Sequence, residues 1–287
     1  MAVKGFKRSL AAVLVHEGGN VDDPRDSGGR TSHGITQRVY DGYRRRQGRE
    51  PRDVYAMSQA ERDSIYRQQY WNAVKGDDLP SGLDYVVFDG AVNSGPGQSI
   101  KWLQRALGAR YTGKVDGVMG AVTLDAVDAH PDHDALIAAI CARRMAFLRA
   151  LRTWRTFGKG WTRRVSAVRA TGQAWAAGEK GLPVVFVTGG EAKANIEDAR
   201  SRPSTMAADM ATGVGGAGAA VKPIESAIVT ATDQLSPLAS VSEHIAYIVA
   251  ALTVSGVLMM IGGIAWRAYV KRRAAERDDA LDLQGAS

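Results

Sequence analysis

A run of 22 uncharged residues near the C-terminus, Ile245 to Trp266, limits the folds open to this chain more than any other feature. About 20 apolar residues in a helix are enough to cross the hydrocarbon core of a bilayer. No neighbouring segment offers a core in which such a run is buried. We therefore predict a transmembrane helix over residues 245–266 and a charged tail over 267–287. Small residues such as Ala250 and Gly256 would let two copies of this helix pack together.

Charge is unevenly distributed along the chain. Lys and Arg total 37 and Asp and Glu 30, a net charge of +7, but residues 135–178 hold nine basic residues and no acidic one. The basicity is therefore local. A single cysteine excludes an intramolecular disulfide framework, and five scattered histidines argue against a structural zinc site.

Hydrophobic periodicity predicts that residues 1–90 form one helical domain. Phe6 and Leu10 begin an apolar stripe at helical spacing, and Ser58 followed by Glu61 is a capping-box pattern at the start of another helix. No run alternates with period two. We therefore expect a mainly α fold whose strands are few and short.

Two further regions follow this domain. Residues 91–178 continue with helices, including a long one from about residue 134 to 154, and are predicted to form a second helical domain. Residues 179–241 are rich in Gly, Ala, Ser, Thr and Pro and show little amphipathic pattern, apart from a possible short strand over 184–187. We interpret 179–241 as a flexible linker.

Glu17 is the strongest candidate for a catalytic residue. It lies seven residues after Leu10, so it continues the apolar stripe of the first helix. Partial burial disfavours the charged form of a carboxyl, which raises its pKa and suits a general acid. Asp26 follows in a glycine-rich loop, with the hydroxyls of Thr31 and Ser32 just beyond it. A buried acid, a solvated carboxylate and a hydroxyl that positions water meet the needs of glycoside hydrolysis, although a helix C-cap with a polar turn explains the same spacing.

A longer pattern surrounds this cluster. It consists of Glu17-Gly18-Gly19, Asp23-Pro24, Asp26, Gly28-Gly29, Thr31, Gly34-Ile35-Thr36, Tyr70-Trp71 and Asp89 with Asn93-Ser94-Gly95. Over residues 9–90 the pattern resembles the glycoside hydrolase 108 family of phage and bacterial N-acetylmuramidases. The resemblance implies a lysozyme-like helical fold, Glu17 as the catalytic glutamate and no requirement for a cofactor.

The sequence departs from the family pattern at two places. Asn20 stands where the family usually has an aromatic residue. Four residues separate Asp26 from Thr31 where phage lysozymes usually have five, so Ser32 competes with Thr31. The neighbouring Asp22 and Asp23 compete with Asp26 for the role of second carboxylate, and the spacing of the three is not that of a calcium loop, so no metal site is expected.

Residues 88–165 resemble the predicted peptidoglycan-binding domain that often follows this hydrolase, through the sequences at 88–108 and 115–127. That resemblance implies glycan binding, or a segment that completes the catalytic domain. Aromatic and amide side chains suit sugar rings. The candidate glycan contacts are Asn93, Gln98, Trp102 and Gln104, with core packing an equal alternative for Trp102.

The basic segment 135–178 carries aromatic residues among its arginines, a pattern that can also bind nucleic acid. No nucleic-acid motif accompanies it. A solvated helix face, or contact with an anionic envelope surface, therefore explains it better, and we expect no specific nucleic-acid partner.

Taken with the resemblance, the sequence predicts a membrane-tethered endolysin-type muramidase that cleaves the β-1,4 bond between N-acetylmuramic acid and N-acetylglucosamine. The basic residues after the apolar run place the C-terminus in the cytoplasm, and so a single-pass inner-membrane protein acts on the wall outside, although no cleavable signal precedes it. The alternatives are a lytic transglycosylase and an inactive wall-binding or secretion accessory protein.

Overall fold

The computed structural model describes residues 2–21, 30–179, 193–206, 209 and 243–283. The chain divides into two compact units. Unit 1 consists of Met1–Arg200 with Ala280–Asp282, and unit 2 of Ser201–Asp279 with Leu283–Ser287.

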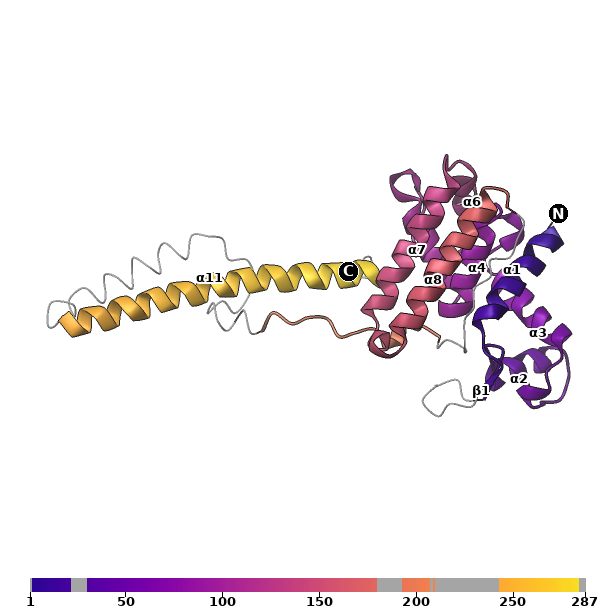
Figure 1. Cartoon of the computed structure of the whole chain (residues 1–287), viewed down its shortest axis with the longest axis horizontal. Coiled ribbons are helices and arrows are strands. Elements are labelled where there is room, and N and C mark those ends of the chain that lie inside the picture. Colours follow the sequence, from indigo (N-terminus) through magenta and orange to yellow (C-terminus); the bar gives the residue numbers. More distant parts are fainter. Residues whose placement is uncertain (1, 22–29, 180–192, 207–208, 210–242, 284–287) are drawn as a thin grey trace. The chain divides into compact units, whose positions relative to one another are not determined.

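Unit 1 is mainly helical, as the sequence predicts (Figure 1). Its longer helices are α1 (Ala2–His16), α2 (Gln37–Arg46), α3 (Gln59–Tyr66), α4 (Leu83–Ser94), α5 (Pro96–Ala106), α6 (Ala121–Asp128), α7 (His133–Ala150) and α8 (Trp154–Ala176). Short helical turns are η1 (Val54–Ala56), η2 (Arg67–Trp71), η3 (Gly76–Asp78), η4 (Gly108–Arg110) and η5 (Ile196–Asp198). The predicted capping box is present at the start of α3, where Ser58 and Glu61 bond each other's backbone. The long helix expected over 134–154 instead ends at Ala150, and Trp154 begins α8.

Helix α4 forms the centre of unit 1. Every residue from Leu83 to Asn93 is buried, and α1, α5, α7 and α8 pack against this helix. A helix that is apolar on all sides is stable only when other elements enclose it. Asp89, in the middle of α4, is therefore surrounded by protein, and this placement governs the chemistry described below.

The hydrophobic core runs through both regions that the sequence assigned to separate helical domains. Buried side chains from α1 to α4 and from α5 to α8 form one cluster, in which Trp102 packs against Phe147 and Tyr85 against Trp175. Helices α7 and α8 lie side by side along this unit (Figure 1). Residues 91–178 thus share one core and one compact unit with residues 1–90.

Three two-residue strands form a small antiparallel sheet in the order β1-β2-β3. They are β1 (Asn20–Val21), β2 (Thr31–Ser32) and β3 (Ile35–Thr36). The turn between β2 and β3 has positive φ at both central residues, His33 (φ 48) and Gly34 (φ 74). Such a turn matches the twist of an antiparallel hairpin. It brings the hairpin back towards the end of α1.

Residues 193–200, which the sequence assigned to a flexible linker, pack against unit 1. Ala194 is completely buried and its N–H donates to the carbonyl of Asn93 at 3.0 Å, while the N–H of Arg152 donates to the carbonyl of Asp198 at 2.8 Å. An extended segment held by backbone hydrogen bonds needs no amphipathic pattern, so its sequence gives no signal of packing. The possible strand at 184–187 lies outside the described residues.

Unit 2 contains α11 (Glu243–Ala280), which includes the helix predicted over residues 245–266. Among the residues that the structure describes, no helix is both long enough and apolar enough to cross a membrane. The apolar stretch is one part of a helix that continues through charged residues, with Arg272 paired to Glu276 at 3.0 Å. The predicted transmembrane span, the inner-membrane location and the lipid and self-association partners inferred from it are not supported.

Candidate active site

Glu17 follows directly after the last residue of α1. Its N–H still donates to the carbonyl of Val13 at 3.3 Å, so its backbone continues the helical pattern. The side chain is 2% exposed. The burial expected from the apolar stripe is therefore confirmed and is more complete than the half-desolvation that the stripe predicts.

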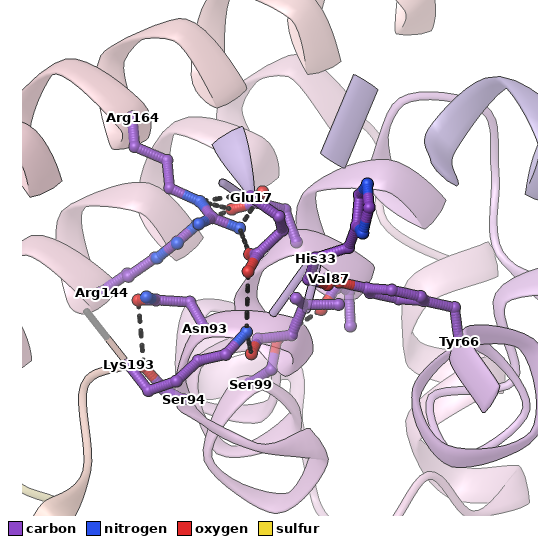
Figure 2. A network of polar contacts seen from close by, with 12 residues as sticks. Glu17, His33, Tyr66, Val87, Asn93, Ser94, Ser99, Arg144, Arg164 and Lys193 are labelled. Atoms are coloured by element: carbon purple, nitrogen blue, oxygen red, sulfur yellow. Dashed lines mark hydrogen bonds and ion pairs between the residues drawn. The ribbon is translucent and has the colours of Figure 1, made fainter. Parts of the chain in front are cut away.

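Two cations occupy the two oxygens of the Glu17 carboxylate. Arg164 of α8 donates from Nη2 to Oε1 at 3.0 Å, and Lys193 donates from Nζ to Oε2 at 3.1 Å. Figure 2 shows the two side chains arriving from different segments of the chain, with Lys193 extended past the end of α4. Lys193 also donates to the carbonyl of Val92 at 2.8 Å.

Asp89 fixes the position of Arg164. Its two oxygens accept from Nε and Nη2 of Arg164 at 2.9–3.2 Å, and Oδ1 also accepts from Nη1 of Arg144 in α7 at 2.6 Å. Asp89, Arg144 and Arg164 are each 2% exposed or less. Bidentate, charge-assisted pairing of this kind holds a guanidinium in one orientation. Asp89 is therefore engaged in positioning Arg164 against Glu17.

The pKa of Glu17 differs in direction from the sequence-based expectation. Burial raises the pKa, as expected, but the charges and hydrogen bonds of Lys193 and Arg164 outweigh burial and hold it below its usual value. The predicted raised pKa is therefore wrong for the arrangement described, in which Glu17 is ionised at neutral pH. Burial likewise raises the pKa of Asp89, but the charges of Arg164, Arg144 and His16 together outweigh burial and hold it well below its usual value.

The β2–β3 turn covers one side of the Glu17 carboxylate. A Cβ added to Gly34 would lie 2.1 Å from Glu17 Oε2, so only glycine fits there. The hydroxyl of Tyr66 donates to the carbonyl of His33 at 2.7 Å. Burial and the charge of Glu17 raise the pKa of Tyr66 well above its usual value and that of Tyr70 to about 12. Both tyrosines are therefore neutral hydroxyl groups beside the site.

The other predicted catalytic residues have different placements. Thr31 and Ser32 form β2, whose pairing sets Ser32 opposite Asn20, three residues after Glu17. Ser32 is buried, with its Oγ 3.0 Å from Nδ1 of His33. Asp26 and its competitors Asp22 and Asp23 lie outside the described residues.

The four candidate glycan contacts lie in different surroundings. Trp102 and Gln104 are each 1% exposed, and Gln104 bonds Asp116, Thr123 and the backbone of 117–118, so both belong to the packing and present no surface to a sugar. Asn93 is also buried, but it lies at the end of α4 next to the carbonyl that binds Lys193. The amide of Gln98 donates to Asp282 at 2.6 Å.

Arg144, Arg164 and Lys193 are the residues that sequence reasoning missed. Arg164 lies on the buried face of α8 with Trp161, Val165 and Val168, at helical spacing, so an arginine in an apolar stripe was the available signal. Such an arginine needs a buried partner. Lys193 offered no signal, because it follows a stretch without pattern. Among the described residues, no group of histidine, cysteine, aspartate and glutamate side chains has the arrangement of a metal site.

Comparisons with known proteins identify what the two halves of unit 1 resemble. A family model described as "Glycosyl hydrolase 108" matches residues 10–95, and one described as "Predicted Peptidoglycan domain" matches residues 98–166. A solved structure titled "Structure of Brucella abortus SagA" is 41% identical, with a TM-score of 0.54, and the match covers 61% of this chain and 97% of that one. No curated protein matches the chain. Glu17 lies in the first matched region and Arg164 in the second, so the charged cluster around Glu17 draws on both.

Proposed function

Because the chain belongs to the glycosyl hydrolase 108 family and is a peptidoglycan hydrolase, we propose that it cleaves the β-1,4 bond between N-acetylmuramic acid and N-acetylglucosamine. Glu17 acts as the general acid that protonates the glycosidic oxygen. Asp26, with Thr31 or Ser32, stabilises the developing positive charge or positions the attacking water. The biological role that fits this activity is that of an endolysin-type lysis protein.

The observation that carries the proposal is the placement of Glu17. Its carboxylate is buried at the end of α1, and Arg164, itself held by Asp89, fixes its orientation. A general acid must stand within hydrogen-bond reach of the leaving oxygen in a fixed direction. A Cβ added to Gly19, two residues after Glu17, would meet no atom within 4 Å.

Asn93 is the candidate glycan contact that adjoins the groups around this acid. Its position at the C-terminal end of α4, next to Val92, places it beside the ammonium of Lys193 that contacts Glu17. We include Asn93 in the proposed substrate site because of this position, and we leave out Trp102 and Gln104, which are equally buried and belong to the packing around α5. Gln98, which bonds Asp282, stays a prediction.

The test compares Glu17→Gln with Glu50→Gln in the full chain. Glu50 is an exposed glutamate of the same region, so its variant controls for the loss of one carboxylate. We expect Glu17→Gln to lower the rate of turbidity loss of purified peptidoglycan by roughly 10²–10⁴, the usual contribution of general acid catalysis. Glu50→Gln keeps the wild-type rate. Circular dichroism establishes the folded fraction of each variant.

Mass spectrometry of the released muropeptides defines the reaction. Reducing N-acetylmuramic acid ends support hydrolysis at the proposed bond, and products lighter by one water, with an anhydro ring, identify a lytic transglycosylase instead. Full activity of a folded Glu17→Gln protein would overturn the assignment of the acid. A wild-type protein that binds peptidoglycan and releases no fragment would be the inactive accessory protein.

A further inference from the structure

Glu17 is closed to substrate in the arrangement described. Its side chain is 2% exposed and each carboxylate oxygen is occupied by a cation. A general acid has to touch the oxygen that it protonates. At least one of the groups that cover Glu17 must therefore move before a glycan is cleaved.

The two cations differ in how firmly they are held. Arg164 belongs to the long helix α8, is completely buried and is clamped by both oxygens of Asp89. Lys193 belongs to residues 193–200, which we call the strap. Its side chain is 25% exposed, and Asn195, Ile196 and Glu197 of the strap are exposed to solvent. Displacing Arg164 breaks the centre of unit 1, whereas displacing Lys193 breaks few contacts.

The contacts of the strap are mainly backbone hydrogen bonds to two places. Ala194 bonds the end of α4 through Asn93, and Asp198 and Arg200 bond the connection between α7 and α8 through Arg152 and Ala150. The only completely buried side chain of the strap is the small one of Ala194. Segments with little buried apolar surface open at a low free-energy cost.

The charges of the cluster also single out Lys193. Among the described residues, Glu17 and Asp89 face Arg144, Arg164 and Lys193, so two carboxylates meet three cations. The buried His16 also interacts with both carboxylates, but burial lowers its pKa, so it is neutral at neutral pH. Without Lys193 the ionised cluster is neutral. With Lys193 in place, protonation of Glu17 leaves two uncompensated positive charges in a buried site, which is costly. Lys193 therefore opposes the protonated state that the catalytic acid needs.

We propose that the strap is an autoinhibitory segment that places Lys193 on Glu17, and that it leaves the site when peptidoglycan binds. Both family matches end before the strap, at residues 95 and 166, so neither assigns it a role. The proposal rests on Glu17 being the catalytic acid. In the closed form, the ammonium of Lys193 lies against the Glu17 carboxylate, in the position that the proton and the glycosidic oxygen need during catalysis.

The experiment compares four full-length proteins: wild type, Lys193→Met, Ala194→Leu and Lys159→Met. Lys193→Met removes the ammonium and keeps an unbranched side chain. Ala194→Leu keeps the ammonium but adds bulk at the buried anchor of the strap. Lys159→Met removes an exposed lysine of α8 as the matched control. Peptidoglycan hydrolysis is measured as kcat/KM from pH 4 to 9, and hydrogen exchange of residues 193–200 reports strap opening.

We expect both strap variants to raise kcat/KM at neutral pH, by about tenfold if the closed form holds about 90% of the wild type. In Lys193→Met the alkaline limb of the pH profile moves to higher pH, because Glu17 keeps its proton longer. In Ala194→Leu, exchange over 193–200 becomes faster. Lys159→Met matches the wild type in every measurement.

Unchanged or lower kcat/KM in both strap variants would overturn the proposal. A lower kcat/KM in Lys193→Met alone would also overturn it, because Lys193 would then be a positioning residue of an open site. A failed Glu17 assignment gives a different result. In that case the double variant Glu17→Gln, Lys193→Met keeps activity, whereas under our proposal it is as inactive as Glu17→Gln.

Discussion

Two buried glutamates in unit 1 are both surrounded by cations, and they differ in where their partners come from. Glu61 accepts from the backbone and hydroxyl of Ser58 at 3.0 Å, from Tyr40 at 3.1 Å and from Arg44 at 3.0 Å, and it also pairs with Arg52. All of these lie within 21 positions of Glu61. The partners of Glu17, Arg164 and Lys193, lie 147 and 176 positions away.

This difference distinguishes a carboxylate with a local structural role from the one that we propose is catalytic. The partners of Glu61 link α2, the segment that precedes η1, and the start of α3. The partners of Glu17 come from α8 and the strap, and one of them, Lys193, is partly exposed. Burial with cations is thus common to both sites, and the distant origin of the partners distinguishes them.

The largest expected effect comes from replacing each glutamate by glutamine and comparing the loss of activity with the loss of stability. We expect Glu17→Gln to lower the rate of hydrolysis by a factor of roughly 10²–10⁴. Glu61→Gln lowers the free energy of unfolding by about 1–3 kcal/mol, because it weakens charge-assisted hydrogen bonds, and leaves kcat per folded molecule unchanged. Hydrolysis rates and urea unfolding of both variants check this. A catalytic loss in folded Glu61→Gln would erase the distinction.

Asp89→Asn tests how much the ion pairs of Asp89 with Arg144 and Arg164 contribute to the stability of unit 1, for comparison with the ion pairs of Glu61. It leaves Arg144 and Arg164 buried without their shared counter-charge, and we expect it to lower the free energy of unfolding by about 3–5 kcal/mol. Asp63→Asn, which removes an exposed partner of Arg62, is the control and costs at most about 1 kcal/mol. Equal losses in urea unfolding would show that burial of the cluster contributes little.

Gly34→Ala tests the tight cover over Glu17, with Gly48→Ala as its match. Both glycines have positive φ, 74 and 66, but a Cβ on Gly48 would meet no atom within 4 Å. We expect Gly48→Ala to cost about 1 kcal/mol of backbone strain and no activity. Gly34→Ala has the same backbone strain and also displaces the Glu17 carboxylate. We therefore expect its activity to fall about tenfold or more. Similar activities for the two variants would mean that the turn is not part of the site.

The smallest effect is the acid dependence of stability at Glu61. Burial raises its pKa, but the hydrogen bonds of Ser58 and Tyr40 and the charge of Arg52 lower it from 4.5 to about 2. A lowered folded-state pKa gives stability that is present above pH 4.5 and is lost as the pH falls towards 2. Urea unfolding of wild type and Glu61→Gln between pH 2 and 5 should therefore converge as the pH falls. A constant difference would contradict the lowered pKa.

The sequence predicts those parts of the structure that depend on near neighbours. The burial of Glu17 follows from its spacing after Leu10, and the capping box of Ser58 and Glu61 is a three-residue pattern. The helical content and the scarcity of strands follow from periodicity in the same way.

The sequence does not predict which distant residues meet. Arg164 in an apolar stripe signals a buried partner, but periodicity does not name Glu17 and Asp89 as that partner. Whether the pKa of Glu17 is raised or lowered depends on the balance between burial and two such distant cations. The sequence predicts the burial but not the two cations. The strap was missed because backbone hydrogen bonds do not depend on side-chain pattern.

The shared core of the two matched regions has a consequence for protein engineering. A domain is usually treated as a part that can be exchanged between proteins, and the match boundary between residues 95 and 98 invites such a cut. Here the cut would separate Glu17 and Asp89 from the two arginines that neutralise them. A chimera that exchanges residues 98–166 keeps these buried ion pairs only if the incoming segment supplies arginines at the positions of Arg144 and Arg164.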